Sequence, residues 1–382
     1  MINYGRHFID NKDISSVIKA LKSSKLTQGN LVSKFENQIK NKFKSKYCCV
    51  VSSGTASLHL SCIALNLKNS IVLTTPNTFL ATANAILYAN AKPDFVDINR
   101  KTFNIDVIKL EEKIIYYKSK KKKVSAVIAT DYAGLPCDWV KLKYLSRKYN
   151  FKLINDNCHA IGAKYNGMGY ATKYADVVTH SYHPVKNITT GEGGAVLTNN
   201  KKVDKRVRIL RNHGLEKMKK NSQYNPWPFE MKQLGYNYRL TDFQCALGIS
   251  QLKKLNKFVK RRRQIAKIYK KEIESVKHVS IQKNENINNH AFHIYPISIN
   301  FKKFKITKNK LIKIFLKNKI KVQTHYFPVH IQPYYKKNYN FKQGDFPEAE
   351  KFYGNTISLP IYYSLKNQEV YKVLRILKKN LK

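Results

Sequence analysis

The sequence predicts an α/β protein with a large domain built on a seven-stranded, mostly parallel sheet flanked by helices, followed by a small α+β domain at the C-terminus. Two observations lead to this prediction. Short apolar runs of strand length alternate with amphipathic stretches of helical length, which is typical of a parallel sheet covered on both faces. Near residue 241 this alternation stops and a long helical pattern begins.

The strands of the large domain are expected where apolar runs are bounded by turn residues. Between several of them lie helical patterns, such as those at 109–117 and 139–149. In sheets of this kind, ligands bind beyond the carboxyl ends of the strands. The seven expected strands are 48–52, 71–75, 94–98, 124–130, 152–155, 177–181 and 195–198.

The second half of the chain is organised by one long helix. Thr241 and Gln244, in "TDFQ", form a capping box, and a helical pattern then runs to about residue 273. We therefore divide the chain into residues 1–250, the large domain with its N-terminal arm, and residues 251–382, the linking helix and the small domain. Within the latter we expect strands at 291–299 and 321–326 and helices at 308–317 and 367–380.

Composition excludes several classes of protein. The N-terminus, "MINYGRHFIDNKD", has no apolar core of a signal peptide, and no apolar run of about 18 residues occurs, so we expect neither secretion nor a membrane span. The cysteines show no metal-ligand spacing, so we expect reduced thiols in a cytoplasmic protein without a metal site. The six are Cys48, Cys49, Cys62, Cys137, Cys158 and Cys245.

The net charge of +47 would fit a nucleic-acid-binding protein. The distribution of charge does not favour this class, because lysines are spread over the whole chain together with abundant Ile and Asn, the residues of A+T-rich codons. The run Lys120–Lys123 is expected in a solvated loop. We predict no nucleic-acid partner, although the charge would attract a small anionic substrate.

A first candidate motif is "VVSSGTASLHL" at 50–60, where a strand ends and a helix begins. The first turn of a helix has free N–H groups and favours an anion. Gly54 allows close approach of the backbone, while Thr55 and Ala56 would supply amides. The motif fits a phosphate site, although most Ser/Thr helix caps bind nothing.

A second candidate is "FKLINDNCHAIGA" at 151–163, in which Asp156 ends a buried strand and His159 follows. A buried carboxylate is costly unless it has a partner. Asp156 could cap the following turn, or it could face a cationic ring nitrogen.

The third candidate is "SYHPVKNITTGEGGAV" at 181–196, in which Pro184 and three glycines restrict the backbone around Lys186. A lysine whose pKa is lowered by burial can attack a carbonyl and form a Schiff base. One ligand would explain all three motifs: pyridoxal phosphate has a phosphate, a protonated ring nitrogen and an aldehyde. A turn that needs Gly and Pro for its own geometry is the alternative for this loop alone.

These motifs identify a resemblance that covers most of the chain. From about Leu26 to Lys378 it resembles the sugar-nucleotide aminotransferases of the DegT/DnrJ/EryC1/StrS group, which have the fold-type I architecture of pyridoxal phosphate enzymes. The shared motifs are "LTQG" (26–29), "SSGTASL" (52–58), "TTPNTFLATANAI" (74–86), "DNCHAIGA" (156–163), "HSYHPVKNITTGEGGAV" (180–196), "RNHG" (211–214) and "GYNYRLTDFQCALG" (235–248). Within the group, "DYAG" (131–134) and the stretch at 74–86 are most similar to the transaminases of pseudaminic acid biosynthesis, which aminate C4 of a UDP-linked 4-keto-6-deoxy-N-acetylhexosamine.

The resemblance implies roles in cofactor binding. Lys186 matches the Schiff-base lysine, Asp156 the partner of the pyridine nitrogen, and Ser181 a phosphate-binding hydroxyl. Asn237, in "GYNYRL", matches an asparagine that reaches the phosphate from the neighbouring subunit. The resemblance therefore implies a homodimer with shared active sites.

Further residues follow from the same resemblance. Phe79 matches a ring that stacks on the cofactor, although core packing is the alternative for a lone phenylalanine, and His159 matches a side chain on the opposite face of the ring. For His325 and Tyr326, packing at a strand end is the alternative to substrate contact. The segments that meet the sugar nucleotide in the pseudaminic acid enzymes correspond here to Tyr4, Lys25, Leu26, Thr27, Gln323, Thr324, His325 and Tyr326.

Taken together, the sequence predicts a cytoplasmic aminotransferase that moves an amino group, by resemblance from glutamate, to a nucleotide-linked keto sugar. His183 is interpreted as structural, and no role is assigned to His330. A 3-dehydratase of the same fold is a rival, but its relatives have histidine at the position of Lys186. The sequence does not fix the sugar, the nucleotide or the amino donor.

Overall fold

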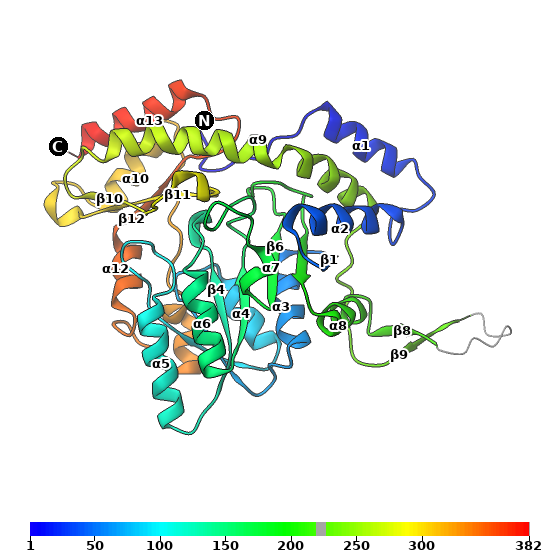
Figure 1. Cartoon of the computed structure of the whole chain (residues 1–382). Coiled ribbons are helices and arrows are strands. Elements are labelled where there is room, and N and C mark those ends of the chain that lie inside the picture. Colours follow the sequence, from blue (N-terminus) through cyan, green and yellow to red (C-terminus); the bar gives the residue numbers. More distant parts are fainter. Residues whose placement is uncertain (219–226, 382) are drawn as a thin grey trace.

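The computed structural model describes residues 1–218 and 227–381, and its centre is a seven-stranded sheet in the order β1-β7-β6-β5-β4-β2-β3 (Figure 1). Strand β7 is antiparallel to both neighbours, and the other pairs are parallel. The predicted mostly parallel sheet is confirmed. Its strands are β1 (Tyr47–Val51), β2 (Ile71–Thr74), β3 (Lys92–Phe95), β4 (Val124–Thr130), β5 (Lys152–Asp156), β6 (Val177–Ser181) and β7 (Gly194–Thr198).

Six of the seven predicted strands match within one residue at each end, and the strand expected at 94–98 is wrong. Strand β3 starts earlier, at Lys92, and includes Pro93, which an edge strand tolerates because its free side needs no N–H donor. After Phe95 the chain turns away from β2, and Ile98 pairs with Ile105 instead.

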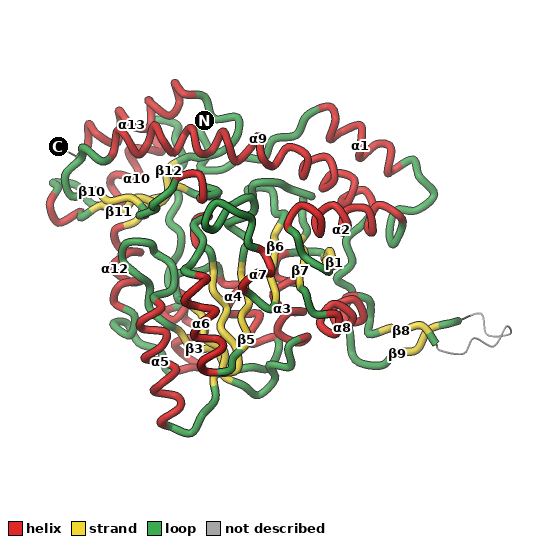
Figure 2. Tube along the Cα trace, viewed as in Figure 1, coloured by secondary structure: helices red, strands yellow, loops and turns green. Residues whose placement is uncertain are grey.

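Helices cover both faces of the sheet (Figure 2). The predicted helix at 109–117 is longer than expected, because Asp106 accepts hydrogen bonds from the amides of Ile108 and Lys109 and so starts it at Val107. The helices are α1 (Asn11–Leu21), α2 (Asn30–Phe43), α3 (Gly54–Ala64), α4 (Leu80–Tyr88), α5 (Val107–Ser119), α6 (Trp139–Tyr149), α7 (Ala171–Tyr174), α8 (Lys201–Arg211), α9 (Asp242–Ile273), α10 (Lys308–Lys317), α11 (Pro333–Tyr339), α12 (Pro347–Asn355) and α13 (Asn367–Asn380).

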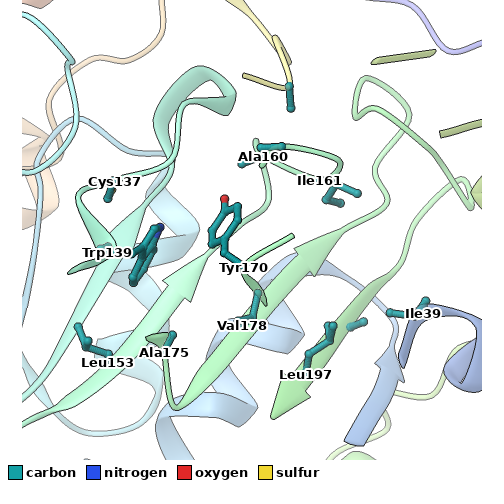
Figure 3. Close-up of a cluster of buried hydrophobic side chains, with 14 of the residues drawn as sticks. Ile39, Cys137, Trp139, Leu153, Ala160, Ile161, Tyr170, Ala175, Val178 and Leu197 are labelled. Carbon is teal, nitrogen blue, oxygen red and sulfur yellow. The ribbon is translucent and has the colours of Figure 1, made fainter. Parts of the chain in front are cut away.

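Side chains alternate between the two faces of each strand, as a period of two requires. Leu153 of β5 packs in the cluster that includes α2, α5, α6 and α9, whereas Ile154 packs against α3 and α4. Figure 3 shows part of the first cluster, with the buried rings of Trp139 and Tyr170 beside β5 and β6. Asp156 therefore points to the α3–α4 side of the sheet.

The long helix α9 begins at the predicted capping box and passes from the sheet to a second hydrophobic cluster (Figure 1). That cluster covers a sheet of three antiparallel strands. The buried guanidinium of Arg262, in α9, donates hydrogen bonds to three backbone carbonyls in the segments next to these strands. The predicted domain boundary at residue 250 falls inside α9 and stays a prediction. The strands of this sheet are β10 (Val279–Ile281), β11 (Tyr295–Ile299) and β12 (Thr356–Leu359).

Of the two strands expected in the C-terminal part, one is shorter than expected and the other is wrong. The first begins only at Tyr295, because residues before it pair with a loop of the large sheet: the amides of Ala291 and His293 donate to the carbonyls of Gly134 and Ala133. Residues 321–326 form no strand. Gln323 alone pairs with Ser358, after which the chain leaves the sheet edge.

A short hairpin, β8 (Leu215–Lys217) and β9 (Phe229–Met231), projects from the body of the protein beside α8 (Figure 1). The sequence patterns did not indicate it. Among the described helices, none has both the length and the apolarity needed to cross a membrane.

Candidate active site

A cavity of about 590 Å³ lies at the carboxyl ends of the parallel strands. Strands β1, β4, β5 and β6 all end at this edge, because β1 runs in the same direction as β6. The edge thus brings together motifs that are far apart in the sequence. Of the predicted residues, Tyr4, Gly54, Thr55, Phe79, Asp156, His159, Ser181, Lys186, Gln323, Thr324, His325 and Tyr326 line the cavity.

One end of the cavity is formed by Gly54 and Ser181. Gly54 is the first residue of α3, and a Cβ atom added to it would lie 2.6 Å from Cβ of Ser181. The glycine therefore keeps open a space next to the Ser181 hydroxyl and the first turn of α3, where N–H groups have no acceptor within the helix. This cradle fits a phosphate. The amide of Ala56 already donates to Oγ of Ser53 (3.0 Å), and Ala56 does not line the cavity.

At the floor of the cavity, Asp156 is 4% exposed and ends β5. Its Oδ2 accepts hydrogen bonds from the hydroxyls of Thr82 (2.7 Å) and Thr130 (3.4 Å), and its Oδ1 accepts from the amide of Cys158 (3.2 Å). Among residues 1–218 and 227–381, no cationic side chain forms an ion pair with it. A buried carboxylate without a cation fits a ligand that supplies a charged N–H.

Lys186 lies in the loop between β6 and β7 and reaches the same cavity. The loop is closed by its backbone, because the Tyr182 amide donates to the Gly193 carbonyl (2.8 Å) and the Lys186 amide donates to the His183 carbonyl (2.9 Å). Gly194 has no room for a side chain, since a Cβ there would lie 2.4 Å from the Ser53 carbonyl oxygen. The loop is thus fixed against the segment that holds Gly54.

Burial lowers the pKa of Lys186, although the nearby Cys158, Asp156 and Glu192 act in the opposite direction. A lower pKa raises the fraction of free amine, which is the form that attacks a carbonyl.

His159 is buried and faces Lys186. The amide of Ala133 donates to its Nδ1 (3.3 Å), so in the neutral ring Nε2 carries the hydrogen and donates to the hydroxyl oxygen of Tyr326 (3.0 Å). Burial lowers the pKa of His159 well below its ordinary value, and the charges of Lys186 and His325 act in the same direction. The imidazole is therefore an uncharged surface against which a flat ring can pack.

Phe79 caps α4 on the cavity wall, with its ring centroid 5.9 Å from that of Tyr326. It is 55% exposed, so its ring is not part of the hydrophobic core and is free to stack on a ligand.

The segment at 323–326 and Tyr4 form another wall of the cavity. His325 is buried; its Nδ1 is 2.8 Å from Oγ of Ser358, and its carbonyl accepts the Tyr132 hydroxyl (2.7 Å). Burial and the charge of Lys186 lower the pKa of His325 to about 3. The segment therefore packs on the body of the protein, as one interpretation of the sequence expected, and it also lines the cavity. Contact of His325 and Tyr326 with the substrate stays a prediction.

Four predicted residues lie elsewhere in the chain. Lys25, Leu26 and Thr27 are exposed and do not line the cavity; Thr27 pairs with Thr241 at the start of α9. Asn237 is also exposed and pairs with Asn212. Within one chain, neither group reaches the cavity.

His183, which the sequence analysis interpreted as structural, and His330, to which it assigned no role, differ in position. His183 is exposed at the cavity, 4.0 Å from a carboxylate oxygen of Glu192. His330 does not line the cavity; it is fully buried and bonds Glu350 (2.9 Å).

Several cavity residues were not expected from the sequence: Thr78, Thr82 and Thr130, which surround Asp156, and Cys158, His293 and Glu192. The ring of His293 lies 4.5 Å from that of His159. A signal for Thr82 was available in the motif at 74–86, whereas His293 lies in no motif.

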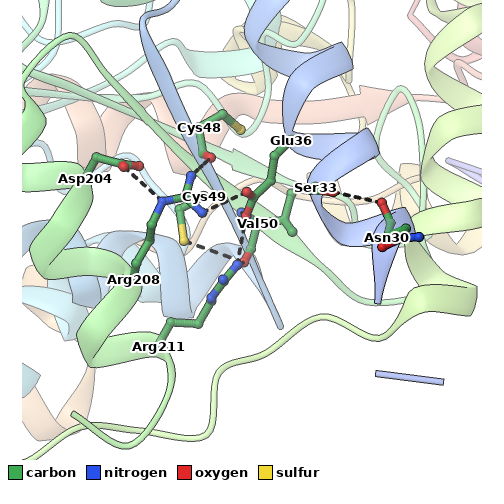
Figure 4. A network of polar contacts seen from close by, with 9 residues as sticks. All are labelled: Asn30, Ser33, Glu36, Cys48, Cys49, Val50, Asp204, Arg208 and Arg211. Carbon is green, nitrogen blue, oxygen red and sulfur yellow. Dashed lines mark hydrogen bonds and ion pairs between the residues drawn. The ribbon is translucent and has the colours of Figure 1, made fainter. Parts of the chain in front are cut away.

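The "RNHG" motif has a structural role that supports the cavity (Figure 4). Arg211 and Arg208 both bind Glu36 of α2, and Arg211 also donates to the carbonyl of Val50 in β1 (2.8 Å). The network fixes the strand that leads into Gly54. Among the described residues, no cluster of side chains could hold a metal ion.

Comparison with known proteins adds the following findings. A sequence model of the DegT/DnrJ/EryC1/StrS aminotransferase family matches residues 7–378. The chain is 39% identical over 365 residues to the UDP-4-amino-4,6-dideoxy-N-acetyl-beta-L-altrosamine transaminase of Campylobacter jejuni subsp. jejuni serotype O:23/36 (strain 81-176), covering 96% of this chain and 93% of that protein. It is 33% identical over 345 residues to the GDP-perosamine synthase of Escherichia coli O157:H7, covering 90% and 88%.

The fold matches a solved structure over its whole length. Helicobacter pylori PseC, an aminotransferase involved in the biosynthesis of pseudoaminic acid, superposes with a TM-score of 0.90 at 29% identity, covering 100% of this chain and 99% of that one.

Proposed function

Because the chain belongs to the DegT/DnrJ/EryC1/StrS aminotransferase family, we propose that it transfers an amino group from glutamate to C4 of a UDP-linked 4-keto-6-deoxy-N-acetylhexosamine. The enzyme is a sugar aminotransferase with the fold-type I architecture, and it uses pyridoxal phosphate. The observation that carries the proposal is the position of Lys186, Asp156 and the Gly54–Ser181 cradle around one cavity. The product would serve the synthesis of a pseudaminic-acid-type cell-surface sugar.

The residues of this cavity divide the chemistry between them. Bound pyridoxal phosphate supplies an aldehyde that takes up the amino group and a ring that accepts carbanion charge. Ser181 and the first turn of α3 would hold its phosphate, and Asp156 would keep a proton on its ring nitrogen. Nζ of Lys186, released as a free amine, would take the proton from Cα of the amino donor and act as acid in the return direction. His159 and Phe79 would hold the ring from its two faces.

The choice of sugar rests on relatives. The Campylobacter jejuni and Helicobacter pylori relatives, both named as UDP-4-amino-4,6-dideoxy-N-acetyl-beta-L-altrosamine transaminases, support a C4 aminotransferase for a UDP-linked altrosamine precursor. The Escherichia coli relative carries the name of a GDP-linked sugar, so another nucleotide-linked keto sugar is the alternative.

The test is an assay of purified enzyme with a panel of UDP-, dTDP- and GDP-linked keto sugars and a panel of amino acids. We expect the UDP-linked 4-keto-6-deoxy-N-acetylhexosamine with glutamate to give the highest kcat/KM, and NMR of the product to place nitrogen on C4. Lys186→Ala is the control and should abolish turnover while the circular dichroism spectrum stays unchanged. Borohydride should attach the cofactor covalently to the Lys186 peptide of the wild type alone. Amination at C3, or a preference for another nucleotide, would contradict the proposal.

We further propose a homodimer in which each subunit completes the cavity of the other. Asn237 is exposed on a loop whose neighbouring Tyr236 and Tyr238 stack on each other, 5.0 Å apart. Thr27 is hydrogen-bonded in the bridge to Thr241, so Lys25, Leu26 and Thr27 lie next to the same loop. If Asn237 reached into the cavity of the partner subunit, Lys25, Leu26 and Thr27 would lie at that cavity too, because they are next to the same loop. This would explain why neither Asn237 nor residues 25–27 line the cavity of their own chain.

Subunit mixing tests the shared cavity. Lys186→Ala and Asn237→Ala homodimers should each be impaired. After subunit exchange, about half of the dimers are mixed and half of their sites are intact, so roughly a quarter of wild-type activity should return. If Asn237 serves the Lys186 of its own chain, no mixed dimer has an intact site and mixing restores nothing. The cytoplasmic location expected from the sequence stays a prediction.

A further inference from the structure

Glu192 lies at the cavity in the turn between Gly191 and Gly193, and its backbone is held firmly. Its carbonyl accepts two hydrogen bonds, from Oγ1 of Thr190 (2.6 Å) and from Nε2 of Gln244 (2.9 Å). Gly193 has no space for a side chain, because a Cβ there would lie 2.2 Å from Oγ1 of Thr190. The position of Glu192 is therefore fixed by contacts on both sides.

The Glu192 carboxylate, by contrast, has no hydrogen-bond donor among residues 1–218 and 227–381. The ring nitrogen Nε2 of His183 lies 4.0 Å from a carboxylate oxygen of Glu192, but burial lowers the pKa of His183, and the Glu192 side chain is 59% exposed. Among the described lining residues, the other carboxylate is that of Asp156, which accepts three hydrogen bonds. A carboxylate that stabilised the turn would have a partner within it, so a structural role does not explain Glu192.

We propose that Glu192 binds and orients the sugar by accepting a hydrogen bond from a hydroxyl or amide N–H group of the sugar next to the reacting carbon. An ionised carboxylate can only accept hydrogen bonds. It repels the diphosphate of the nucleotide and the two carboxylates of glutamate. The amino group of glutamate is the group that the cofactor takes up, which leaves the neutral donors of the sugar ring as partners of Glu192. This inference rests on the proposed function and concerns the half of the reaction in which the sugar is aminated.

The two half-reactions can be measured separately from the absorbance of the bound cofactor. In Glu192→Ala we expect the rate with glutamate to stay within about twofold of wild type. The kcat/KM of the sugar half-reaction should fall on the order of 10- to 100-fold, the effect of losing one hydrogen bond to a charged group. Glu192→Gln keeps an acceptor oxygen but not the charge, so its loss should be smaller. Glu112→Ala, which removes an exposed glutamate from α5, is the matched control and should change neither rate.

A sugar analogue without the donor identifies the contact. The wild type should lose activity with a deoxy or de-N-acetyl analogue, whereas Glu192→Ala should show no further loss, because the two changes remove the same interaction. Additive losses with both analogues would contradict the contact.

The outcomes separate the two proposals. Equal losses in both half-reactions, weaker cofactor retention or a changed dimer would show that Glu192 is structural, and the inference would be wrong. If the wild type aminates a nucleotide-linked sugar and Glu192→Ala has the same kcat/KM in the sugar half-reaction, only the inference about Glu192 fails. If the wild type reacts with glutamate but aminates no nucleotide-linked keto sugar, the proposed function fails and the inference fails with it.

Discussion

Gly54→Ala tests whether the two segments of the phosphate cradle lie as closely as the structure shows. The added Cβ would be 2.6 Å from Cβ of Ser181, whereas carbon atoms in contact are about 3.5–4.0 Å apart. Overpacking of this kind costs about 1–3 kcal/mol, and the better helix propensity of alanine offsets at most about 1 kcal/mol. We therefore expect a net loss of about 1–2 kcal/mol in the free energy of unfolding, together with weaker retention of the cofactor.

A second substitution tests whether the collision with Ser181 causes the loss of stability in Gly54→Ala. Ser181→Gly removes the atom with which the new methyl group collides, so the double variant should be more stable than the sum of the single changes by about 1–2 kcal/mol. Gly354 of α12 is the matched control: it also lies in a helix, but a Cβ there would meet no atom within 4 Å. Gly354→Ala should stabilise the protein by up to about 1 kcal/mol.

Urea unfolding followed by circular dichroism measures the stability of the wild type and the four variants, and dialysis followed by absorbance measures the cofactor that remains. A Gly54→Ala protein as stable as wild type, or a double variant whose losses simply add, would show that Gly54 and Ser181 do not form one cradle.

Three further predictions follow from other parts of the site and the surface. Asp156→Asn should retain the fold but release the cofactor more readily, because the ring nitrogen loses its anionic partner; unchanged retention on dialysis would contradict this. Burial lowers the pKa values of His180 and His325 to about 3, so as the pH falls these histidines are protonated in the unfolded chain before they are protonated in the folded protein. The free energy of unfolding should therefore be highest above pH 6.5 and should be lower by about 2 kcal/mol per histidine at pH 5. Urea titrations at pH 7 and pH 5 measure this difference, and equal stability at the two pH values would refute the prediction. Duplex DNA should bind weakly, without sequence preference, and dissociate with added salt, whereas tight selective binding at physiological salt would reverse our interpretation of the +47 charge.

The parts of the site that were predictable are those in which chemistry and turn geometry coincide within a short segment. Asp156 ends a strand, Gly54 starts a helix, and Lys186 lies in a turn restricted by proline and glycine, so each could be placed at the carboxyl edge of a parallel sheet. Six of the seven strands were predictable for a similar reason, because continuous apolar runs mark a sheet that is covered on both faces.

The parts that were missed depend on packing between distant segments. Thr82 lies within the motif at 74–86, but it reaches Asp156 only because α4 packs on the side of the sheet to which Asp156 points, and the motif alone does not show that contact. His293 enters the cavity because its segment is tied to the loop at Ala133. The amide of Ala56 was assigned to a ligand although Ser53, one position before the helix, is a preferred cap residue, and this hydrogen bond could have been expected.

The charge of the cavity gives a separate argument for a shared site. Burial lowers the pKa values of His159, His183, His293 and His325, so among the described lining residues Lys186 is the remaining source of positive charge. A nucleotide-linked sugar carries a diphosphate and glutamate carries two carboxylates, and anions of this kind are normally bound by arginine or lysine. The lysines spread over the surface can attract such substrates from a distance, but they cannot hold them at the reacting carbon. Cations from a partner subunit would meet this need, which is a reason independent of Asn237 to expect that two chains complete each cavity.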